Sequence, residues 1–205
     1  MIREEETRLI GRILAGETQL FEAFVNENQT TVYNLALRMT GSEQDALDAS
    51  QDAFMKAFHS LSSFRGDSKF SVWLYRLTVN ACLDLLRRRS RRNEVSLTDD
   101  EDSDDQEPIE MSVPDERFCP ETELEKKELR EAVQRAVVQL SPDFRQALLL
   151  REVSGLSYEE IGEALQLESG TVKSRIFRAR KKLAQLLMAD GNFSTLASSD
   201  GKEAR

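Results

Sequence analysis

A concentrated run of cations lies near the carboxyl end of the chain, in "KSRIFRARKKL" at residues 173–183. Six of these eleven residues are Lys or Arg and none is acidic, although the 205-residue chain carries a formal net charge of −9. On a helical wheel at about 100° per residue, the apolar side chains share one stripe. Its members are Val172, Ile176, Ala179, Leu183 and Leu187. The stripe predicts a helix whose apolar face packs on neighbouring helices.

The opposite face of this helix combines cations with a hydroxyl group and one aromatic ring. Its members, with the two flanking cations, are Lys173, Ser174, Arg175, Phe177, Arg178 and Lys181. Lys and Arg neutralise phosphates, Ser and Arg reach base edges, and Phe contacts a thymine methyl group or a sugar. The pattern favours a helix in the major groove of DNA over a solvated charged face with one stray aromatic side chain.

Two shorter helices must position the basic helix. Ser141, Pro142 and Asp143 supply an N-cap, a first-turn proline and a first-turn acid. Ser157 and Glu160 form a capping box before the next apolar run. The short turn "QLESG" then leads into the basic helix, which completes the outline of a helix-turn-helix. This motif predicts DNA binding, but it does not say which task the binding serves.

A second candidate nucleic-acid surface lies on the helix predicted over 69–92. This helix is apolar around most of its circumference, which predicts the most buried helix of the N-terminal part. One polar strip remains, formed by Trp73, Arg76, Asn80, Asp84 and Arg87. A Trp beside Arg and Asn can stack on an unpaired base; the alternative is a boundary Trp half-covered by its neighbours. The terminal run "RRRSRR" favours a phosphate-binding patch over a solubilising end, and comprises Arg87, Arg88, Arg89, Arg91 and Arg92.

The loop "SFRGDSKF", residues 63–70, precedes that helix. Gly66 permits a turn that other residues resist, and Asp67 or Ser68 is predicted to cap the helix. Aromatic side chains bracket the loop and cations lie between them: Phe64 and Phe70, Arg65 and Lys69. An aromatic-flanked basic loop beside the Trp strip can hold a flipped base.

A third helix, predicted over 43–61, has Ser42 as its N-cap. Its apolar stripe consists of Leu47, Phe54, Phe58 and Leu61. Another face carries Asp45, Asp48, Gln51 and Asp52. Two interpretations of that acidic face stay open: a solvent face, or a docking surface for a basic partner helix.

Charge is segregated along the chain. Residues 94–125 hold fourteen acids and one base, a net charge of −13, which leaves +4 of the total −9 for all other residues. Proline-rich and poor in large apolar residues, this segment is predicted to be a disordered linker. The sequence therefore predicts an all-α protein with a helical domain at 1–93, an acidic linker at 94–122, a helix-turn-helix domain at 123–189 and a flexible tail at 190–205.

Several classes of protein lack support in the sequence. No apolar run is long enough to span a membrane, and the N-terminus lacks the features of a signal peptide. The two cysteines, Cys82 and Cys119, are expected to be free thiols in a cytoplasmic protein. A single histidine, His59, argues against a metal site, and it is predicted to lie mid-helix among core residues. No phosphate loop and no HExxH motif occur, so we expect no cofactor and no enzymatic activity.

Taken in order, four segments resemble the group 4 (extracytoplasmic-function, ECF) sigma factors of bacterial RNA polymerase. They are "DASQDAFMKAF", "SFRGDSKFSVWLYRLTVNACLDLLRRR", "GLSYEEIGEAL" and "SGTVKSRIFRARKKL". The resemblance covers about residues 10–92 and 123–187. It is specific, because two separate domain signatures occur in the right order on either side of a variable linker.

The resemblance implies a role for each surface. The acidic face would dock on the coiled coil of the polymerase β′ clamp, and the second domain would meet the β flap. The loop, with Lys56 and Asn80 close by, would capture an extruded base of the −10 element, and the Trp73 strip would hold the melting strand. The residues assigned to the −10 element are Lys56, Phe64, Arg65, Asp67, Ser68, Lys69, Phe70, Trp73, Arg76 and Asn80. The arginine run would hold upstream duplex, and the basic helix would recognise the −35 element. It also implies a partner that inhibits the protein, an anti-sigma factor.

The sequence departs from the family pattern at a few positions. Leu47 replaces a usual acid, Ala49 and Ser50 replace larger apolar residues, and Glu168 stands where many members cap the recognition helix. We expect Ser169 to cap that helix instead.

We also expect the free chain to bind DNA poorly, because a linker leaves the domains unfixed and its acids repel phosphate.

One rival function is an ordinary helix-turn-helix regulator that does not act as a polymerase subunit. Such proteins pair the DNA-binding helix with a ligand-binding or receiver domain. Residues 1–93 show no α/β pattern of that kind, and they carry a second cationic surface instead.

Overall fold

The structure is a computed structural model that describes residues 3–96 and 120–190. The side chains of residues 92–96 and 120–126 lie outside the description, as do most of the predicted linker and the predicted tail. Over the described residues the chain is helical and contains no strand, which confirms the predicted all-α class with two helical domains.

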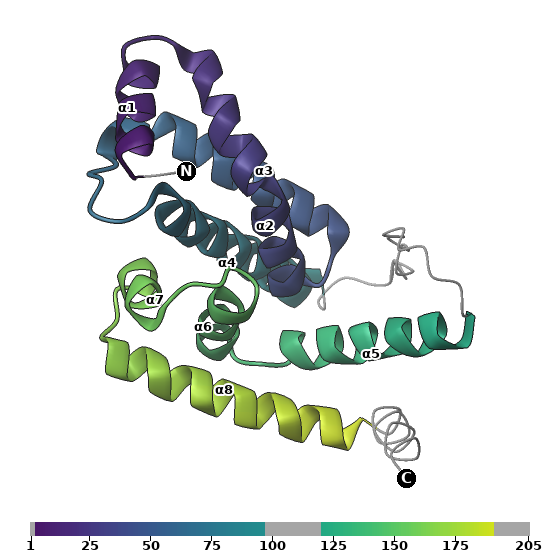
Figure 1. Cartoon of the computed structure of the whole chain (residues 1–205). Coiled ribbons are helices and arrows are strands. Elements are labelled where there is room, and N and C mark those ends of the chain that lie inside the picture. The colour runs from purple at the N-terminus through teal and green to yellow at the C-terminus, as the bar shows by residue number, and fades with distance from the viewer. Residues whose placement is uncertain (1–2, 97–119, 191–205) are drawn as a thin grey trace.

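The first domain begins with a short helix and continues with three long helices (Figure 1). Its elements are α1 (Arg3–Leu14), the 3₁₀ turn η1 (Thr18–Phe21), α2 (Glu22–Thr40), α3 (Glu43–His59), the 3₁₀ turn η2 (Leu61–Ser63) and α4 (Phe70–Ser96). Each of α2, α3 and α4 packs against the other two. As predicted, Ser42 caps α3, since its hydroxyl oxygen accepts a hydrogen bond from the N–H of Asp45 at 3.3 Å.

The second domain contains four helices, and α8 lies along its outer side (Figure 1). They are α5 (Pro120–Val138), α6 (Pro142–Glu152), α7 (Tyr158–Leu165) and α8 (Ser169–Ala189). All three shorter helices of this domain contact α8. At their edges, α4 and α5 extend a few residues into the segment predicted as linker, at 94–122.

The buried stripe of α3 differs from the predicted one. Leu47 is 47% exposed, whereas the buried positions are all small: Ala46, Ala49, Ser50, Ala53 and Ala57. Small side chains allow α3 to pack closely against both α2 and α4, so the larger Leu47 falls on the outside. Leu61 is buried as predicted, and Phe54 and Phe58 are half-buried.

An aromatic cluster forms the core where the 64–69 loop meets α4. Phe70 is fully buried, and its ring lies 4.1 Å from that of Phe24 and 5.9 Å from that of Phe64, between centroids. Phe70 therefore anchors the end of the loop in the core. It does not belong to the exposed surface of the loop, where the sequence predicted a contact to DNA.

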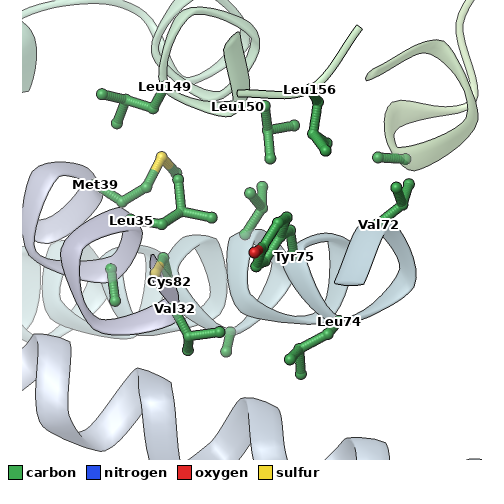
Figure 2. Packing of buried hydrophobic residues seen from close by; sticks show 14 of the residues in the cluster. Val32, Leu35, Met39, Val72, Leu74, Tyr75, Cys82, Leu149, Leu150 and Leu156 are labelled. Carbon is green, nitrogen blue, oxygen red and sulfur yellow. The ribbon is translucent and has the colours of Figure 1, made fainter. Parts of the chain in front are cut away.

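The two domains are in contact, although the sequence predicted domains left unfixed by a linker. α7 packs against α4, and α5 and α6 pack against α2. Figure 2 shows three leucines of the second domain, Leu149, Leu150 and Leu156, facing apolar side chains of α2 and α4. All three are at most 5% exposed.

Polar groups at the end of α2 fix the geometry of this contact. The last carbonyl groups of a helix have no partner within the helix. The carbonyl oxygen of Met39 accepts a hydrogen bond from Arg145 of α6 at 2.7 Å. Gln134 of α5 donates to the carbonyl oxygens of Leu37 and Arg38 at 3.3 and 3.4 Å. The second domain thus supplies donors for the final turn of the first domain's helix.

Candidate nucleic-acid interface

The helix-turn-helix is built as the sequence predicts, with a capping box at the start of α7. The hydroxyl oxygen of Ser157 accepts from the N–H of Glu160 at 3.1 Å, and the Glu160 carboxylate accepts from the N–H of Ser157 at 2.9 Å. The turn into α8 passes close to Gly162, where a Cβ atom would lie 2.7 Å from the carbonyl oxygen of Leu167. Glycine at 162 therefore allows the tight angle between α7 and α8.

The apolar stripe of α8 packs on the rest of the domain. Val172, Ile176 and Ala179 are at most 1% exposed, and Leu183 and Leu187 are partly buried. The predicted cap is wrong: Glu168 is the N-cap residue, and Ser169 is the first residue of the helix. The hydroxyl group of Ser169 instead lies 3.4 Å from the carboxylate of Glu159, to which it donates.

The opposite face of α8 is open. Phe177 is 71% exposed, and the neighbouring exposed residues are Lys173, Ser174, Arg178 and Lys181. Arg175 differs from them because its guanidinium lies 3.4 Å from the carboxylate of Asp143 and its side chain is 25% exposed. Five of the six predicted contact residues on this helix therefore share one accessible face, and Arg175 lies at its edge.

Tyr158 belongs to this surface, although no sequence pattern predicted it there. The ammonium group of Lys173 lies 5.5 Å from the centre of the Tyr158 ring, and the Arg151 guanidinium lies 5.0 Å from it. A cation over an aromatic face is held by the ring quadrupole. The only sequence signal was an aromatic residue at the first position of α7, which by itself indicates no contact to α8.

The 64–69 loop presents most of its predicted contact residues to the outside. Arg65, Asp67 and Lys69 are exposed, and Phe64 and Ser68 are half-buried. Phe70 is excluded as a direct contact by its complete burial.

Lys69 already has a partner in the second domain. Its ammonium group lies 2.9 Å from the carboxylate of Glu160. The N–H of Ser157 and then Lys69 hold the pKa of Glu160 below its ordinary value, and the hydrogen bond to Glu160 raises the pKa of Lys69. The loop is thus joined by an ion pair to the first helix of the helix-turn-helix.

The polar strip of α4 has the predicted order. Trp73 is half-buried, with its ring 5.2 Å from that of Phe64, while Asn80 is exposed. Arg76 is half-buried, and Asp84 forms an ion pair with Arg87 at 3.3 Å. Part of the Trp73 ring is therefore accessible, while the rings of Phe64 and Phe70 pack against the rest of it.

The arginine run lies on the last turns of α4. Arg87, Arg88, Arg89 and Arg91 are exposed, whereas the side chain of Arg92 lies outside the described residues. Arg89 is bonded to Asp45 of α3 at 3.2 Å. One predicted phosphate contact and one predicted polymerase contact therefore neutralise each other in this state.

The acidic face of α3 also carries exposed apolar side chains. Asp48, Gln51 and Asp52 are exposed. Leu47 and Met55 lie one turn to either side of Gln51 and are 47% and 56% exposed. Met55 was not predicted on this face and Leu47 was predicted in the buried stripe, although their spacing of four residues from Gln51 places both on its face. Lys56, predicted at the −10 site, is exposed on the same helix.

No group of metal-ligating side chains is found within the described part of the chain. His59, predicted among core residues, is instead the exposed last residue of α3. Cys82 is buried, and burial raises the pKa of its thiol to about 12. None of the described helices combines the length and the apolar content that a bilayer crossing requires.

The fold and its two cationic surfaces define a two-domain helical protein whose second domain is a DNA-binding helix-turn-helix. The family model "Sigma-70 region 2" matches residues 24–92, and "Sigma-70, region 4" matches residues 130–183. The RNA polymerase sigma-H factor of Pseudomonas aeruginosa is 37% identical over 187 residues, which cover 91% of this chain and 96% of that protein. The ECF RNA polymerase sigma-E factor of Escherichia coli K12 is 40% identical over 176 residues, which cover 85% and 90% respectively.

A solved structure shows the same architecture. It contains a sigma factor from Bartonella quintana in complex with the anti-sigma factor NepR, and it superposes with a TM-score of 0.59 and 27% identity over 82% of this chain and 99% of that one. The chain belongs to the sigma-70 family of RNA polymerase sigma factors, in its ECF group. It is an alternative sigma factor that directs promoter-specific transcription initiation.

Proposed function

We propose that this sigma factor recognises the −35 element with the open face of α8 and the −10 element with the 64–69 loop and α4. One observation carries the proposal: Phe177 is 71% exposed among cations on a helix whose other face is buried. Leaving a large aromatic ring in water at the centre of a cationic face forgoes the free energy of its burial, which packing against a thymine methyl group would recover.

At the −35 element, residues near the N-terminus of a recognition helix meet base edges. Ser174 and Arg178 have the hydrogen-bonding groups for base edges, and Lys173 and Lys181 can neutralise flanking phosphates. Arg175 is held by Asp143 at the edge of the face, where a phosphate contact fits better than a base contact.

At the −10 element, the exposed loop residues and the α4 strip would bind an extruded base and the melting strand. The proposed contacts are Lys56, Phe64, Arg65, Asp67, Ser68, Lys69, Trp73, Arg76 and Asn80. Stacking on an aromatic ring stabilises an unpaired base by about 1–3 kcal/mol, which offsets part of the cost of local melting. The arginines at the end of α4 would hold upstream phosphates.

Docking on the polymerase would use the α3 face. Asp48, Gln51 and Asp52 complement a basic coiled coil such as that of the β′ clamp, and the exposed Leu47 and Met55 add apolar area. The second domain would meet the β flap. The polymerase would supply all covalent chemistry, and the sigma factor would act in the cytoplasm.

Simultaneous binding of both elements requires the domains to separate. Elements centred at −35 and −10 lie about 25 base pairs apart, which is roughly 85 Å of duplex. In this structure Lys69 lies 2.9 Å from Glu160, and α7 packs directly on α4. The free chain would therefore bind promoter DNA poorly because its domains are held together, and polymerase would open them.

An anti-sigma factor is a further proposed partner. The Bartonella quintana sigma factor was solved in complex with one, and the shared fold extends over both domains. A protein that keeps the domains in contact would maintain the state in which the −35 and −10 surfaces cannot act together.

The test is run-off transcription by core polymerase with and without this chain, on a library of random upstream sequences. We expect chain-dependent transcripts that share two motifs at a fixed spacing. Arg178→Ala should lose discrimination at the −35 motif by about tenfold, because a good base contact contributes about 1–3 kcal/mol. Lys182→Ala, which removes an exposed cation from the same helix, should retain it.

Two results would contradict the proposal. Full −35 discrimination by Arg178→Ala would rule out α8 as the −35 recognition helix, and normal promoter melting by Trp73→Ala would exclude the α4 strip. If the chain gave no transcripts yet selected one short duplex motif alone, an ordinary helix-turn-helix regulator would be the better description.

A further inference from the structure

Two side chains of α1 hold the 64–69 loop. The guanidinium of Arg3 donates hydrogen bonds to the carbonyl oxygens of Gly66 and Asp67, the latter at 2.9 Å. The carboxylate of Glu6 accepts a hydrogen bond from the backbone N–H of Phe70 at 3.2 Å. Arg3 and Glu6 are three residues apart, so they lie on one face of α1. They contact the loop near its middle and at its end.

Glu6 takes the place of the predicted local cap of α4. The first N–H groups of a helix have no partner within it, and a carboxylate there is also favoured by the helix dipole. The N–H of Phe70 donates to Glu6, which lies 64 residues away, rather than to Asp67 or Ser68. Asp67 consequently keeps its side chain exposed.

The burial of Glu6 shows that this contact is specific. Glu6 is 7% exposed, although it carries a carboxylate on a short helix at the edge of the domain. Burying a charged group is costly unless hydrogen bonds compensate for the water that it loses. The N–H at the start of α4 supplies such a bond, so burial ties Glu6 to the loop end.

The loop backbone needs support from outside because of its conformation. Gly66 has φ of 72°, in the left-handed region, and the chain on either side bears the exposed Arg65 and Asp67. A planar guanidinium that bonds two successive carbonyl groups restrains both peptide orientations at once. Arg3 therefore restrains the part of the loop whose side chains face outward.

We propose that Glu6 and Arg3 are positioning residues for −10 recognition: α1 sets the shape of the 64–69 loop and the first turn of α4, and thereby the discrimination of −10 bases. The inference rests on the assignment of that loop to the −10 element. α1 precedes the residues 24–92 matched by the region 2 family model.

The experiment compares Glu6→Ala, Glu6→Gln and Arg3→Ala with two matched controls on the same helix, Glu4→Ala and Arg8→Ala. Each full-length chain is combined with core polymerase. Transcripts are measured from a promoter with the selected −10 element, from promoters with single-base changes in it, and from promoters with changed −35 elements. Competition with labelled wild-type chain measures affinity for core polymerase.

We expect Glu6→Ala to reduce the ratio of transcripts from selected and changed −10 elements by about tenfold, the effect of losing one buried hydrogen bond to a charged group. Glu6→Gln, which keeps an acceptor oxygen, should restore most of the ratio, and Arg3→Ala should lower it several-fold. Discrimination at −35 and affinity for core polymerase should stay at wild-type levels, as should every value for the controls.

Hydrogen exchange of residues 64–70 provides a readout that needs no polymerase. The amides should exchange faster in Glu6→Ala and Arg3→Ala than in the controls. If exchange rises while −10 discrimination stays intact, or if all promoters weaken equally, the positioning role is wrong and α1 only stabilises the domain. Arg3 is exposed, so Arg3→Ala provides this test even if Glu6→Ala does not fold.

Failure of the underlying assignment would give a different pattern. In that case Asp67→Ala and Lys69→Ala would leave −10 discrimination at wild-type levels, whatever the behaviour of the α1 variants.

Discussion

Arg145 is a buried cation at the contact between the two domains. Its guanidinium donates to the carbonyl oxygens of Met39 in α2, of Val138 at the end of α5, and of Leu140 in the connection to α6. The residue is 7% exposed, and burial lowers the pKa of its guanidinium below the ordinary value. A cation beside the C-terminal end of α2 is also favoured by the helix dipole. Arg145 therefore links the two domains through backbone groups.

Replacing Arg145 by Ala should lower the free energy of unfolding by about 2–4 kcal/mol, because three carbonyl groups, two of them in buried bonds, lose a charged donor. Chemical denaturation of the full chain measures this. Arg130→Ala, on the exposed face of α5, is the matched control and should change stability by less than about 0.5 kcal/mol. An equal, small effect for both variants would show that Arg145 does not stabilise the contact.

The geometry of the helix-turn-helix depends on the angle between α7 and α8. Gln166 ends α7 in the left-handed region, with φ of 57°, and the next residue folds back over Gly162. The close approach of the Leu167 backbone to Gly162 therefore determines the turn. The turn sets the angle at which α8 presents its open face.

Gly162→Ala should destabilise the chain by about 1–3 kcal/mol, although Ala has the higher helix propensity. The added Cβ would lie 2.7 Å from the backbone oxygen of Leu167, which cannot move without opening the turn. Gly170→Ala, in the first turn of α8, meets nothing within 4 Å and should be neutral or stabilising by up to about 1 kcal/mol. Thermal unfolding measures both; a stabilising Gly162→Ala would contradict the predicted clash.

The whole molecule is held closed by an apolar contact with ionic and hydrogen-bonded partners around it. The leucines of α6 and of the α6–α7 connection face α2 and α4 (Figure 2), and Lys69 and Glu160 pair where α7 meets the 64–69 loop. This arrangement brings the two domains together in a way that a linear sequence of two domains does not specify.

The closed state should weaken in acid because of Glu160. Its folded pKa lies below the ordinary 4.5, first through the N–H of Ser157 and then through Lys69. A depressed carboxyl pKa contributes stability above the unfolded value and loses it as the pH falls through the folded value. The stability difference between wild type and Glu160→Gln should therefore be constant near neutral pH and shrink below about pH 4.5.

Denaturation of both proteins over a pH series measures this difference. Lys69→Met should reduce the pH-dependent part of this stability difference, because it removes the ion pair between Lys69 and Glu160 that joins the two domains. A wild-type advantage over Glu160→Gln that persisted undiminished to pH 3 would contradict the prediction.

Local sequence patterns are sufficient to predict the helices, the capping box at Ser157 and Glu160, and the buried stripe and open face of α8. These features follow from periodicity and from hydrogen bonds within one turn, which the local sequence fixes. The sequence also identified the family, since the motifs occur in order.

The remaining features depend on how the helices pack against one another in three dimensions. Leu47 is exposed because small residues bring α3 close to its neighbours, Phe70 is buried because the loop returns into an aromatic core, and Glu6 accepts a hydrogen bond from a helix 64 residues away. Each depends on which faces meet once the helices pack, and residue spacing along the chain contains no information about that. The contact between the two domains has the same origin.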